Sequence, residues 1–286
     1  MRKTSLKNVL RKGRLIAAPG IYDMVSMRIA DRMGFEALYM TGYGTVASYL
    51  GLPDAGLATY TDMVDRVRAM CGMADTPVIC DGDTGYGGLL NVAHTVRGYE
   101  AAGAAAIQLE DQEFPKKCGH TPGRRVIPVE DMVKKIKVAV EARTGDMQII
   151  ARTDARTTLG LDEALRRADA YANAGADVLF VESPESEQEL AKIGATFEQP
   201  LLVNIVESGR TPVMPPKVLE EMGFALAIYP ALGFLSAGYA LEKAYGNLHE
   251  TRSSLQNPVP MADFMEFSKM MGFQAVWDFD KRHAER

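Results

Sequence analysis

The sequence predicts an α/β fold, a (β/α)8 barrel of the TIM type, and three observations favour it. A short apolar run followed by a longer amphipathic segment recurs eight times along the chain. The apolar runs do not alternate with polar residues, which is typical of parallel strands buried on both faces. Glycines that can end a helix precede the next apolar run at Gly34, Gly103, Gly175 and Gly223. Eight such units favour a closed barrel over an open, doubly wound sheet.

Each strand is predicted from a short aliphatic run, and each helix is predicted from apolar residues at helical spacing. In chain order, the strand and helix pairs are 15–18 with 24–33, 37–41 with 61–73, 77–80 with 90–102, 105–109 with 128–142, 148–151 with 161–174, 178–181 with 186–196, 200–203 with 216–222, and 225–229 with 234–248. A proline-bounded stretch at 257–260 follows, and then two short helical patterns. An extra helix there could cover one face of the barrel or dock on a neighbouring subunit.

Length and composition are those of an ordinary globular protein. The chain has 286 residues, of which 47% are hydrophobic and 24% are charged, which is enough to bury a large core. No low-complexity or proline-rich linker divides it. We therefore expect a single barrel domain over residues 1–286, with 249–286 as a C-terminal helical extension.

Charge and targeting signals exclude several classes of partner. A formal net charge of -5 removes the usual electrostatic drive toward nucleic acid or an anionic membrane, so we expect neither. The basic N-terminus lacks the apolar core of a signal peptide, and no apolar run reaches about 18 residues. Three cysteines form neither a disulfide framework nor a zinc motif. These features predict a soluble cytoplasmic protein.

Acidic side chains follow two consecutive expected strands. Asp81 and Asp83 come after the strand at 77–80, on one side of an extended chain. Glu110 follows the strand at 105–109. Oxygen ligands without histidine or cysteine suit Mg2+, or Mn2+ as a substitute, rather than Zn2+. The alternative is a simple turn, because Asp-Gly-Asp-Thr-Gly is also favourable turn chemistry.

Polar groups follow four further expected strands. They are residues 41–45 after the second strand, 152–154 after the fifth, Glu182 after the sixth and Asn204 after the seventh. Strand ends are commonly polar, so any one of these positions alone carries little weight. Together they predict a site at the carboxyl end of the barrel, where the active sites of this fold lie.

The segment 114–125 is a glycine- and proline-rich loop with one cysteine among basic side chains. Cys118 stands near Lys116, Lys117, His120, Arg124 and Arg125. Nearby positive charge lowers a thiol pKa and favours the thiolate, and the flanking glycines and prolines predict a lid that closes over a substrate. A solvated basic loop with an incidental cysteine is the alternative. Cys71 and Cys80 fall in a helix and a strand, so we expect them in the core.

Four linked motifs together resemble those of the isocitrate lyase / phosphoenolpyruvate mutase superfamily. They are Asp-Gly-Asp-Thr-Gly-Tyr-Gly at 81–87, Glu-Asp-Gln at 110–112, Lys-Lys-Cys-Gly-His at 116–120 and Ala-Arg-Thr-Asp-Ala at 151–155. Gly-Leu-Pro-Asp at 51–54 and Tyr-Pro at 229–230 extend the similarity, which covers most of the chain.

The resemblance implies a barrel that binds Mg2+ near Asp81 and Asp83, with Asp54 and Glu110 helping through water. It also implies chemistry on a C–C or P–C bond of a small oxo- or hydroxycarboxylate, through an enolate. Members of the family are typically homotetramers, dimers of dimers, that exchange a late helix between subunits. Here the helix after Leu248 is the candidate.

The resemblance also implies roles for individual residues. The lyase branch carries a cysteine in its loop motif, so Cys118 is expected to be the general acid, with His120 beside it. Arg152 can bind the developing negative charge in bidentate fashion, and Tyr43 is the first candidate for the base. The expected substrate contacts are Thr41, Gly42, Tyr43, Gly119, Arg152, Glu182 and Asn204.

The expected substrate is a small dicarboxylate, a 2-alkylmalate or 2,3-dimethylmalate. Family members that take methylisocitrate usually carry an arginine where Leu235 stands here, and no second arginine is evident in 258–267. Pro212, Val213, Phe234 and Leu235 predict an apolar wall instead. The chain thus resembles most the branch of 2,3-dimethylmalate lyase, petal death protein and methylisocitrate lyase. Carboxyphosphonoenolpyruvate phosphonomutase, oxaloacetate acetylhydrolase, methylisocitrate lyase and a barrel that only binds a small acid remain alternatives.

Overall fold

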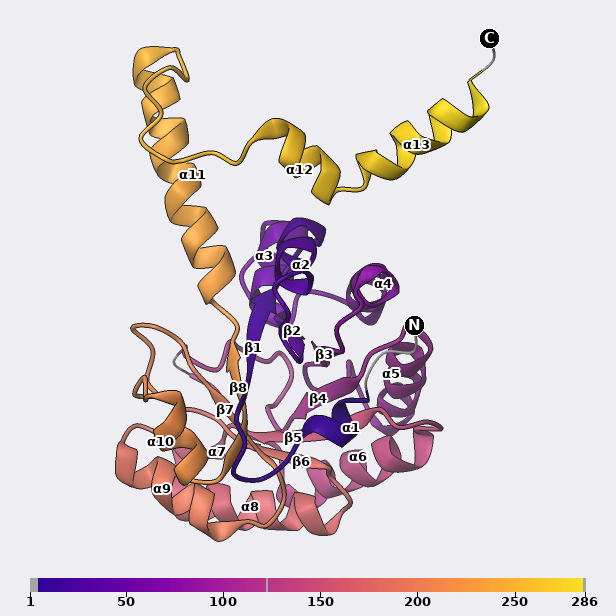
Figure 1. The fold of residues 1–286 in the computed structure, drawn as a ribbon. Helices are drawn as coiled ribbons and strands as arrows, with labels where there is room; N and C mark the ends of the chain where they lie inside the picture. The colour runs from indigo at the N-terminus through magenta and orange to yellow at the C-terminus, as the bar shows by residue number, and fades with distance from the viewer. Residues whose placement is uncertain (1–4, 122, 285–286) are drawn as a thin grey trace. The chain divides into compact units, whose positions relative to one another are not determined.

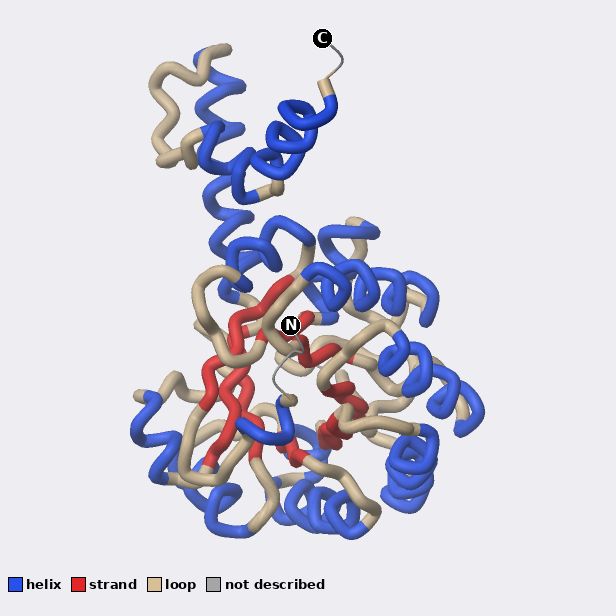
Figure 2. Tube along the Cα trace, turned by 45° about the vertical axis from the view of Figure 1, so that its right-hand side comes forward, coloured by secondary structure: helices blue, strands red, loops and turns tan. Residues whose placement is uncertain are grey.

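The computed structural model describes residues 5–121 and 123–284 and contains the expected closed barrel. Its strands are β1 (Ile16–Ile21), β2 (Leu38–Met40), β3 (Val78–Asp81), β4 (Ala106–Glu110), β5 (Gln148–Thr153), β6 (Val178–Val181), β7 (Leu201–Asn204) and β8 (Phe224–Tyr229). Neighbouring strands pair in parallel in sequence order, and β8 pairs with β1 to close the ring. Figure 2 shows the strands surrounded by helices. The predicted fold class is confirmed.

The helices predicted between the strands are also present. They are α2 (Met24–Asp31), α4 (Tyr60–Met73), α5 (Leu89–Ala101), α6 (Val129–Ala142), α8 (Leu161–Asn173), α9 (Glu187–Thr196), α10 (Pro216–Glu221) and α11 (Leu232–Thr251) (Figure 1). The structure adds three short helices that the sequence pattern did not indicate: α1 (Leu6–Val9), α3 (Gly42–Leu50) and α7 (Ala155–Leu159). No described helix is both long and apolar enough to cross a bilayer.

Local capping explains where several of these helices begin. Asp23 precedes α2, and its side chain accepts a hydrogen bond from the N–H of Ser26 over 2.7 Å. Thr59 and Ser186 cap α4 and α9 in the same way. Each cap binds an N–H group that has no partner within the helix. The capping residues therefore fix the point at which the chain leaves each strand-end loop, and the loops carry the candidate site.

One cluster of apolar side chains fills the barrel. It includes Ile16 from β1, Ile79 from β3, Ile150 from β5 and Phe180 from β6, all essentially inaccessible to solvent. Leu6 of α1 belongs to the same cluster. A closed barrel of this kind is a packed core and not a pore, so ligands must bind at its ends.

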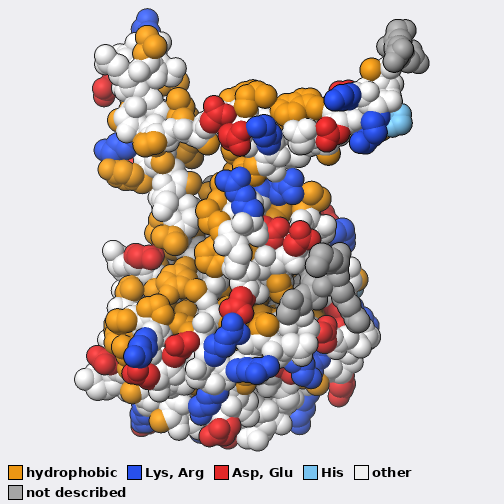
Figure 3. All heavy atoms as spheres, viewed as in Figure 1, with side chains coloured by type: hydrophobic (Ala, Val, Ile, Leu, Met, Phe, Trp, Pro, Cys, Tyr) orange, Lys and Arg blue, Asp and Glu red, His pale blue; other side chains and the backbone are white. Residues whose placement is uncertain are grey.

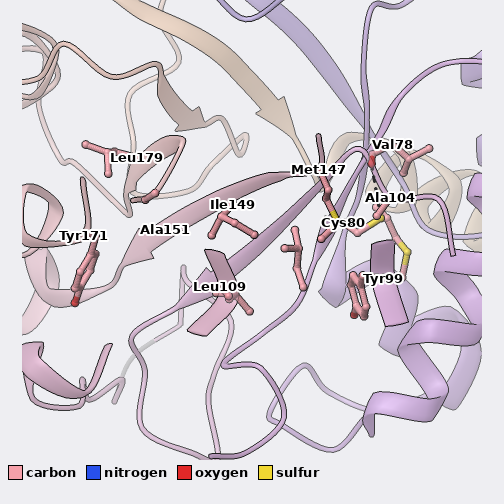
Figure 4. Close-up of a cluster of buried hydrophobic side chains, with 14 of the residues drawn as sticks. Val78, Cys80, Tyr99, Ala104, Leu109, Met147, Ile149, Ala151, Tyr171 and Leu179 are labelled. Carbon is pink, nitrogen blue, oxygen red and sulfur yellow. Dashed lines mark hydrogen bonds between the residues drawn. The ribbon is translucent and has the colours of Figure 1, made fainter. Parts of the chain in front are cut away.

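A second cluster packs between the strands and the outer helices. Figure 4 shows part of it, including Ile149 and Leu109 from neighbouring strands and Tyr99 of α5. Cys71 and Cys80 are buried in this cluster, so the expectation that they belong to the core is confirmed. This packing fixes the strands against their helices and holds the strand ends in register.

The chain divides into two compact units, Met1–Gly233 and Phe234–Arg286. The second unit contains most of α11 together with α12 (Phe264–Met270) and α13 (Phe273–His283), where the two short helical patterns were predicted. None of the side chains in these three helices is buried. Large apolar side chains are instead exposed along them, including Tyr245 and Phe264 at 64% and 79%, as the orange surfaces in Figure 3 illustrate.

Candidate active site

The ends of β3 and β4 bring three buried carboxylates to one rim of the barrel. Asp81 is the last residue of β3, Asp83 follows it closely, and Glu110 ends β4. Hydrogen bonds of 2.9 Å join these ends, from Gly82 N–H to Gln108 O and from Glu110 N–H to Asp83 O. Asp83 has a φ of +47°, a left-handed conformation that is uncommon outside glycine. The turn holds the Asp83 side chain beside the ends of both strands.

Lys116 pairs with two acidic residues of this rim. Its Nζ lies 2.7 Å from Asp83 Oδ1 and also forms an ion pair with Asp54, in the loop between α3 and α4. The Asp54 carbonyl accepts a hydrogen bond of 3.1 Å from Cys118 N–H, so the cysteine loop is attached to the acidic cluster. Lys116 was expected only as a positive charge near the thiol and was not predicted as a site residue. Its place beside Cys118 in the motif was the one available signal.

Burial governs the protonation of these groups. Desolvation raises the pKa of Asp83 to about 7 despite the attraction of Lys116. Desolvation likewise raises the pKa of Asp81, and it raises the pKa of Glu110 well above its usual value. For Lys116, burial alone would lower the pKa, but the surrounding carboxylates raise it well above its usual value. A divalent cation at this rim would favour the ionised carboxylates in the same way.

The donor set fits Mg2+ in its chemistry. Glu110 Oε1 is buried without a hydrogen-bond partner, and Asp83 Oδ1 has only its ion pair with Lys116. Over the described ranges 5–121 and 123–284, no group of three or more Asp, Glu, His or Cys side chains is arranged so that it could hold a metal ion. Mg2+ usually binds through one or two carboxylates and keeps several waters, so an open set of oxygens is compatible with it. Asp81, Asp83, Asp54 and Glu110 therefore stay the predicted ligands of the ion.

Arg152 on β5 lies among three carboxylates. Its Nε and Nη2 each donate a hydrogen bond of 2.9 Å to Asp154. Its Nη1 lies 3.4 Å from Glu110 Oε2, and its Nη2 lies 3.3 Å from Glu182 Oε2. Burial opposes the charge, but these three carboxylates raise the pKa of Arg152 well above its usual value. The guanidinium is therefore a permanent cation, of the kind that binds carboxylate ligands in bidentate fashion.

Asn204, at the end of β7, connects Glu182 and His120. Its Nδ2 lies 3.1 Å from Glu182 Oε2 and 3.1 Å from His120 Nε2. The Nδ1 of His120 accepts a hydrogen bond of 3.3 Å from Arg210 N–H. Burial lowers the pKa of His120 below its usual value, so the imidazole is neutral near pH 7. A neutral ring suits hydrogen bonding to a ligand better than ion pairing.

The backbone at Gly119 passes directly beside Arg152. A Cβ at Gly119 would clash with Arg152 Nη2 and lie 2.8 Å from Glu182 Oε2. The Gly119 carbonyl accepts a hydrogen bond of 3.0 Å from Ser183 Oγ. In this conformation the loop requires glycine here, and it places the neighbouring cysteine at the same rim as Arg152.

The thiol of Cys118 differs from the sequence-based expectation. Desolvation raises its pKa above the usual value, and it outweighs the opposing effects of a backbone hydrogen bond and of Arg152 and Lys116. Lys116 and Arg152 do lower the thiol pKa, as predicted, but the expected net lowering was wrong because burial of the sulfur outweighs them. The thiol stays protonated near neutral pH and can donate a proton.

The first turn of α3 adjoins Asp81. A Cβ at Gly42 would lie 2.5 Å from Asp81 Oδ2. The first helical hydrogen bond of α3 runs from the N–H of Thr45 to the carbonyl of Thr41, so 42–44 form the N-terminal turn of the helix. Amides in this position attract anionic groups. Tyr43, in the same turn, is 41% exposed.

The predicted apolar wall is divided between the two compact units. Pro212 and Val213 lie in the loop after β7, and Val213 is 59% exposed. Phe234 and Leu235 belong to the second unit. The wall therefore stays a prediction.

A closed eight-stranded parallel barrel with buried acidic and basic side chains at the carboxyl ends of its strands defines a class of protein, the (β/α)8-barrel enzymes. Residues 6–249 match the profile of the family described as phosphoenolpyruvate phosphomutase. The chain belongs to this family, within the phosphoenolpyruvate mutase / isocitrate lyase superfamily, and it is an enzyme.

The chain is similar to curated proteins along nearly its whole length. It is 45% identical over 280 residues to 2,3-dimethylmalate lyase of Eubacterium barkeri, covering 98% of this chain and 97% of the relative. Petal death protein of Dianthus caryophyllus is 37% identical, with 98% and 89% covered. The 2-methylisocitrate lyase of Bacillus subtilis strain 168 is 39% identical, with 95% and 89% covered. These relatives support a carbon–carbon lyase activity.

Solved structures show the same similarity. Oxaloacetate acetylhydrolase in complex with 3,3-difluorooxalacetate matches with a TM-score of 0.93 and 34% identity, covering 99% of this chain and 97% of the other. A crystal structure of 2,3-dimethylmalate lyase matches with a TM-score of 0.89 and 36% identity, covering 95% and 91%.

Proposed function

We propose that this protein is a Mg2+-dependent lyase that cleaves the C–C bond of a substituted malate, of the 2-alkylmalate or 2,3-dimethylmalate type, through an enolate. The contact between the Gly119 backbone and Arg152 is the observation that carries the proposal. It puts the loop with a protonated thiol, Cys118, beside the cation best suited to bind a substrate carboxylate. The similarity to 2,3-dimethylmalate lyase supports the same substrate class.

The chain's own residues account for the proton transfers. Arg152 and the amides at the start of α3 bind and orient the carboxylates of the substrate. Tyr43 is our candidate for the base that takes the hydroxyl proton. As the C–C bond breaks, its electron pair passes into the enolate of the departing acid, and the hydroxyl carbon becomes the carbonyl of an oxo acid. The Cys118 thiol then donates a proton to the enolate carbon.

The remaining predicted residues complete the site. Thr41, Gly42, Glu182 and Asn204 would contact the substrate, and His120 would donate or accept a hydrogen bond as a neutral ring. Asp81, Asp83, Asp54 and Glu110 would hold an ion that, when bound, would supply Lewis-acid stabilisation of negative charge on the substrate. Mn2+ should substitute for Mg2+ because it prefers the same oxygen ligands.

Oxaloacetate hydrolysis is the second candidate, because an oxaloacetate acetylhydrolase is among the structures that this chain resembles. In that reaction water would add to the C2 carbonyl of oxaloacetate, and the C2–C3 bond would then break. The products would be oxalate and acetate. Phosphonate formation is a third candidate, since the chain is 38% identical to a carboxyvinyl-carboxyphosphonate phosphorylmutase of Arabidopsis thaliana. Cleavage of methylisocitrate is a fourth, supported by the lyases that act on it.

A substrate panel tests these alternatives directly. The purified enzyme with Mg2+ should release an oxo acid from 2-alkylmalates or 2,3-dimethylmalate faster than from methylisocitrate. Oxalate released from oxaloacetate at a higher kcat/KM would favour the hydrolase instead. Phosphonate formation, seen by phosphorus NMR with carboxyphosphonoenolpyruvate, would favour the mutase.

We also propose a cytoplasmic homotetramer, built as a dimer of dimers that exchange the helix after Leu248. The exposed apolar side chains of α11, α12 and α13 support association with other subunits. Light scattering should give four times the chain mass of 31.2 kDa. A monomer at micromolar concentration would contradict the proposal.

A further inference from the structure

Arg124 and Arg125 are adjacent in the loop after β4, yet their surroundings differ. The side chain of Arg125 is 76% exposed and pairs with Glu113. The side chain of Arg124 is 1% exposed. Its Nη1 donates to Asp154 Oδ1 and its Nη2 donates to Thr157 Oγ1, both over 2.6 Å. The structure therefore buries one arginine of the pair and leaves its neighbour in solvent.

Asp154 is shared by two arginines. Its Oδ1 accepts from both Arg124 and Arg152, and its Oδ2 accepts from Arg152. Its backbone N–H donates to Asp111 Oδ1 over 2.8 Å, which ties it to the end of β4. Asp154 is inaccessible to solvent, so water cannot replace either arginine without a rearrangement. The carboxylate thus connects the cysteine loop to β5.

The same loop therefore reaches Arg152 from two directions. Gly119 packs against Nη2 of Arg152, as described above. Arg124 reaches Arg152 through the Asp154 carboxylate. Neither set of contacts forms unless the loop is in place.

We propose that Arg124 is a positioning residue: by holding Asp154, it fixes Arg152 in the orientation that binds a carboxylate ligand, and it makes that orientation depend on the placement of the cysteine loop. The inference rests on the proposed function only in that Arg152 binds the ligand. It assigns to Arg124 a role beyond a positive charge near the thiol.

Loss of Arg124 has a definite consequence for Arg152. Arg152 lies among Asp154, Glu110 and Glu182, and its orientation reflects the balance of these three attractions. Without Arg124, Asp154 loses one of its two cations and attracts Arg152 more strongly. The guanidinium is then less available to a ligand. Hydrogen bonds to charged groups are strong enough that ligand affinity should fall by about tenfold or more.

The probe is oxalate with Mg2+, and its dissociation constant is measured by calorimetry on the full-length protein. Arg124→Gln should weaken binding by about tenfold or more. Arg124→Lys keeps the charge but cannot make both contacts, and should show a smaller loss. Arg125→Gln is the matched control and should bind as the wild type does. Thermal unfolding of each variant shows that the fold is intact, and the lysine variant serves if the glutamine variant does not fold.

A double-mutant cycle tests whether Arg124 acts through Asp154. In an Asp154→Asn background, Arg124→Gln should cause little further loss of oxalate affinity. Independent, additive losses would overturn the inference, as would wild-type affinity in the folded Arg124 variants. If the wild type itself does not bind Mg2+ and oxalate, both this inference and the proposed function fail.

The two proposals are otherwise separable. If the Arg124 and Asp154 substitutions lower oxalate affinity non-additively and no malate is cleaved, the role of Arg124 is retained and the lyase is rejected. If a substituted malate is cleaved and the two substitutions lower oxalate affinity additively, the lyase is retained and the role of Arg124 is rejected.

Discussion

At the scale of single residues, burial decides the chemistry of the site. Basic neighbours around Cys118 suggest a thiolate from the sequence, yet desolvation in the folded loop raises the thiol pKa. A protonated thiol suits the general acid that the proposed reaction needs, whereas a thiolate would suit a nucleophile. The sequence shows which charges are near, but it does not show how much water the loop excludes.

Gly119 provides a steric test at the same scale. Gly119→Ala must move either the cysteine loop or Arg152, because the added methyl group would meet both Arg152 and Glu182. Displacements of about 1 Å at an active site cost on the order of a hundredfold in rate, so kcat/KM should fall by about that factor. Gly88→Ala is the control, since a Cβ there has no neighbour within 4 Å. Equal activity of the two variants would show that the loop does not adopt this position during catalysis.

The raised pKa of Asp83 predicts how Mg2+ affinity depends on pH. Its pKa is raised to about 7, so below that pH the carboxyl group is protonated and a proton competes with the metal. Mg2+ affinity should therefore be highest above pH 7 and fall as the pH is lowered, by up to about tenfold per pH unit. Calorimetric titration at several pH values measures this. Asp83→Asn should bind Mg2+ weakly and show a smaller pH dependence, since Asp81 and Glu110, whose pKa values are also raised, still titrate; a wild-type affinity that is constant with pH would reject the assignment.

At the scale of elements, the sequence predicts the repeating parts and misses the short ones. All eight strands lie close to the expected ranges, because each is a buried apolar run bounded by polar or glycine residues. The helix α3 was not expected, since two glycines in Gly42-Tyr43-Gly44 favour a loop by local propensity. Its N-terminus instead gains from the close approach of Gly42 to Asp81, which is a tertiary contact.

The sequence pattern also does not predict which side chains far apart in the sequence pair with one another. Asp54 and Lys116 are 62 positions apart, and Arg124 and Asp154 are 30 apart. The sequence does place the acidic residues at strand ends, because parallel strands in a barrel share one carboxyl end. It does not indicate which loop side chain pairs with which strand-end carboxylate, since that depends on how each loop folds over the rim.

A substitution at Asp111 tests whether its hydrogen bonds join β4, β5 and α8. It accepts hydrogen bonds from Thr153 Oγ1, Asp154 N–H, Arg167 and Tyr171, over 2.7 to 3.1 Å. Asp111→Ala leaves Arg167 without its main buried partner and should lower the free energy of unfolding by about 3–5 kcal/mol, measured by urea denaturation. Asp162→Ala, which removes an exposed ion pair with Lys192, should change stability little. Similar stabilities would mean that this network does not hold β4, β5 and α8 together.

At the scale of the whole molecule, the barrel and the C-terminal unit differ in what they bury. The barrel has two apolar clusters of its own and carries the candidate site at one end. None of the side chains in α11, α12 or α13 is buried. The barrel therefore accounts for the site, whereas the second unit is the part expected to gain stability from another subunit.

We propose that the acidic rim, Arg152 and the Cys118 thiol together cleave a substituted malate. The most direct measurement is the rate of pyruvate release from 2,3-dimethylmalate, with Mg2+, with EDTA, and with EDTA followed by excess Mg2+. The wild type should be active, lose activity in EDTA and recover it on addition of Mg2+, and folded Cys118→Ser should be slower by about a hundredfold or more. Metal-independent release, or equal rates for the wild type and the serine variant, would contradict the account.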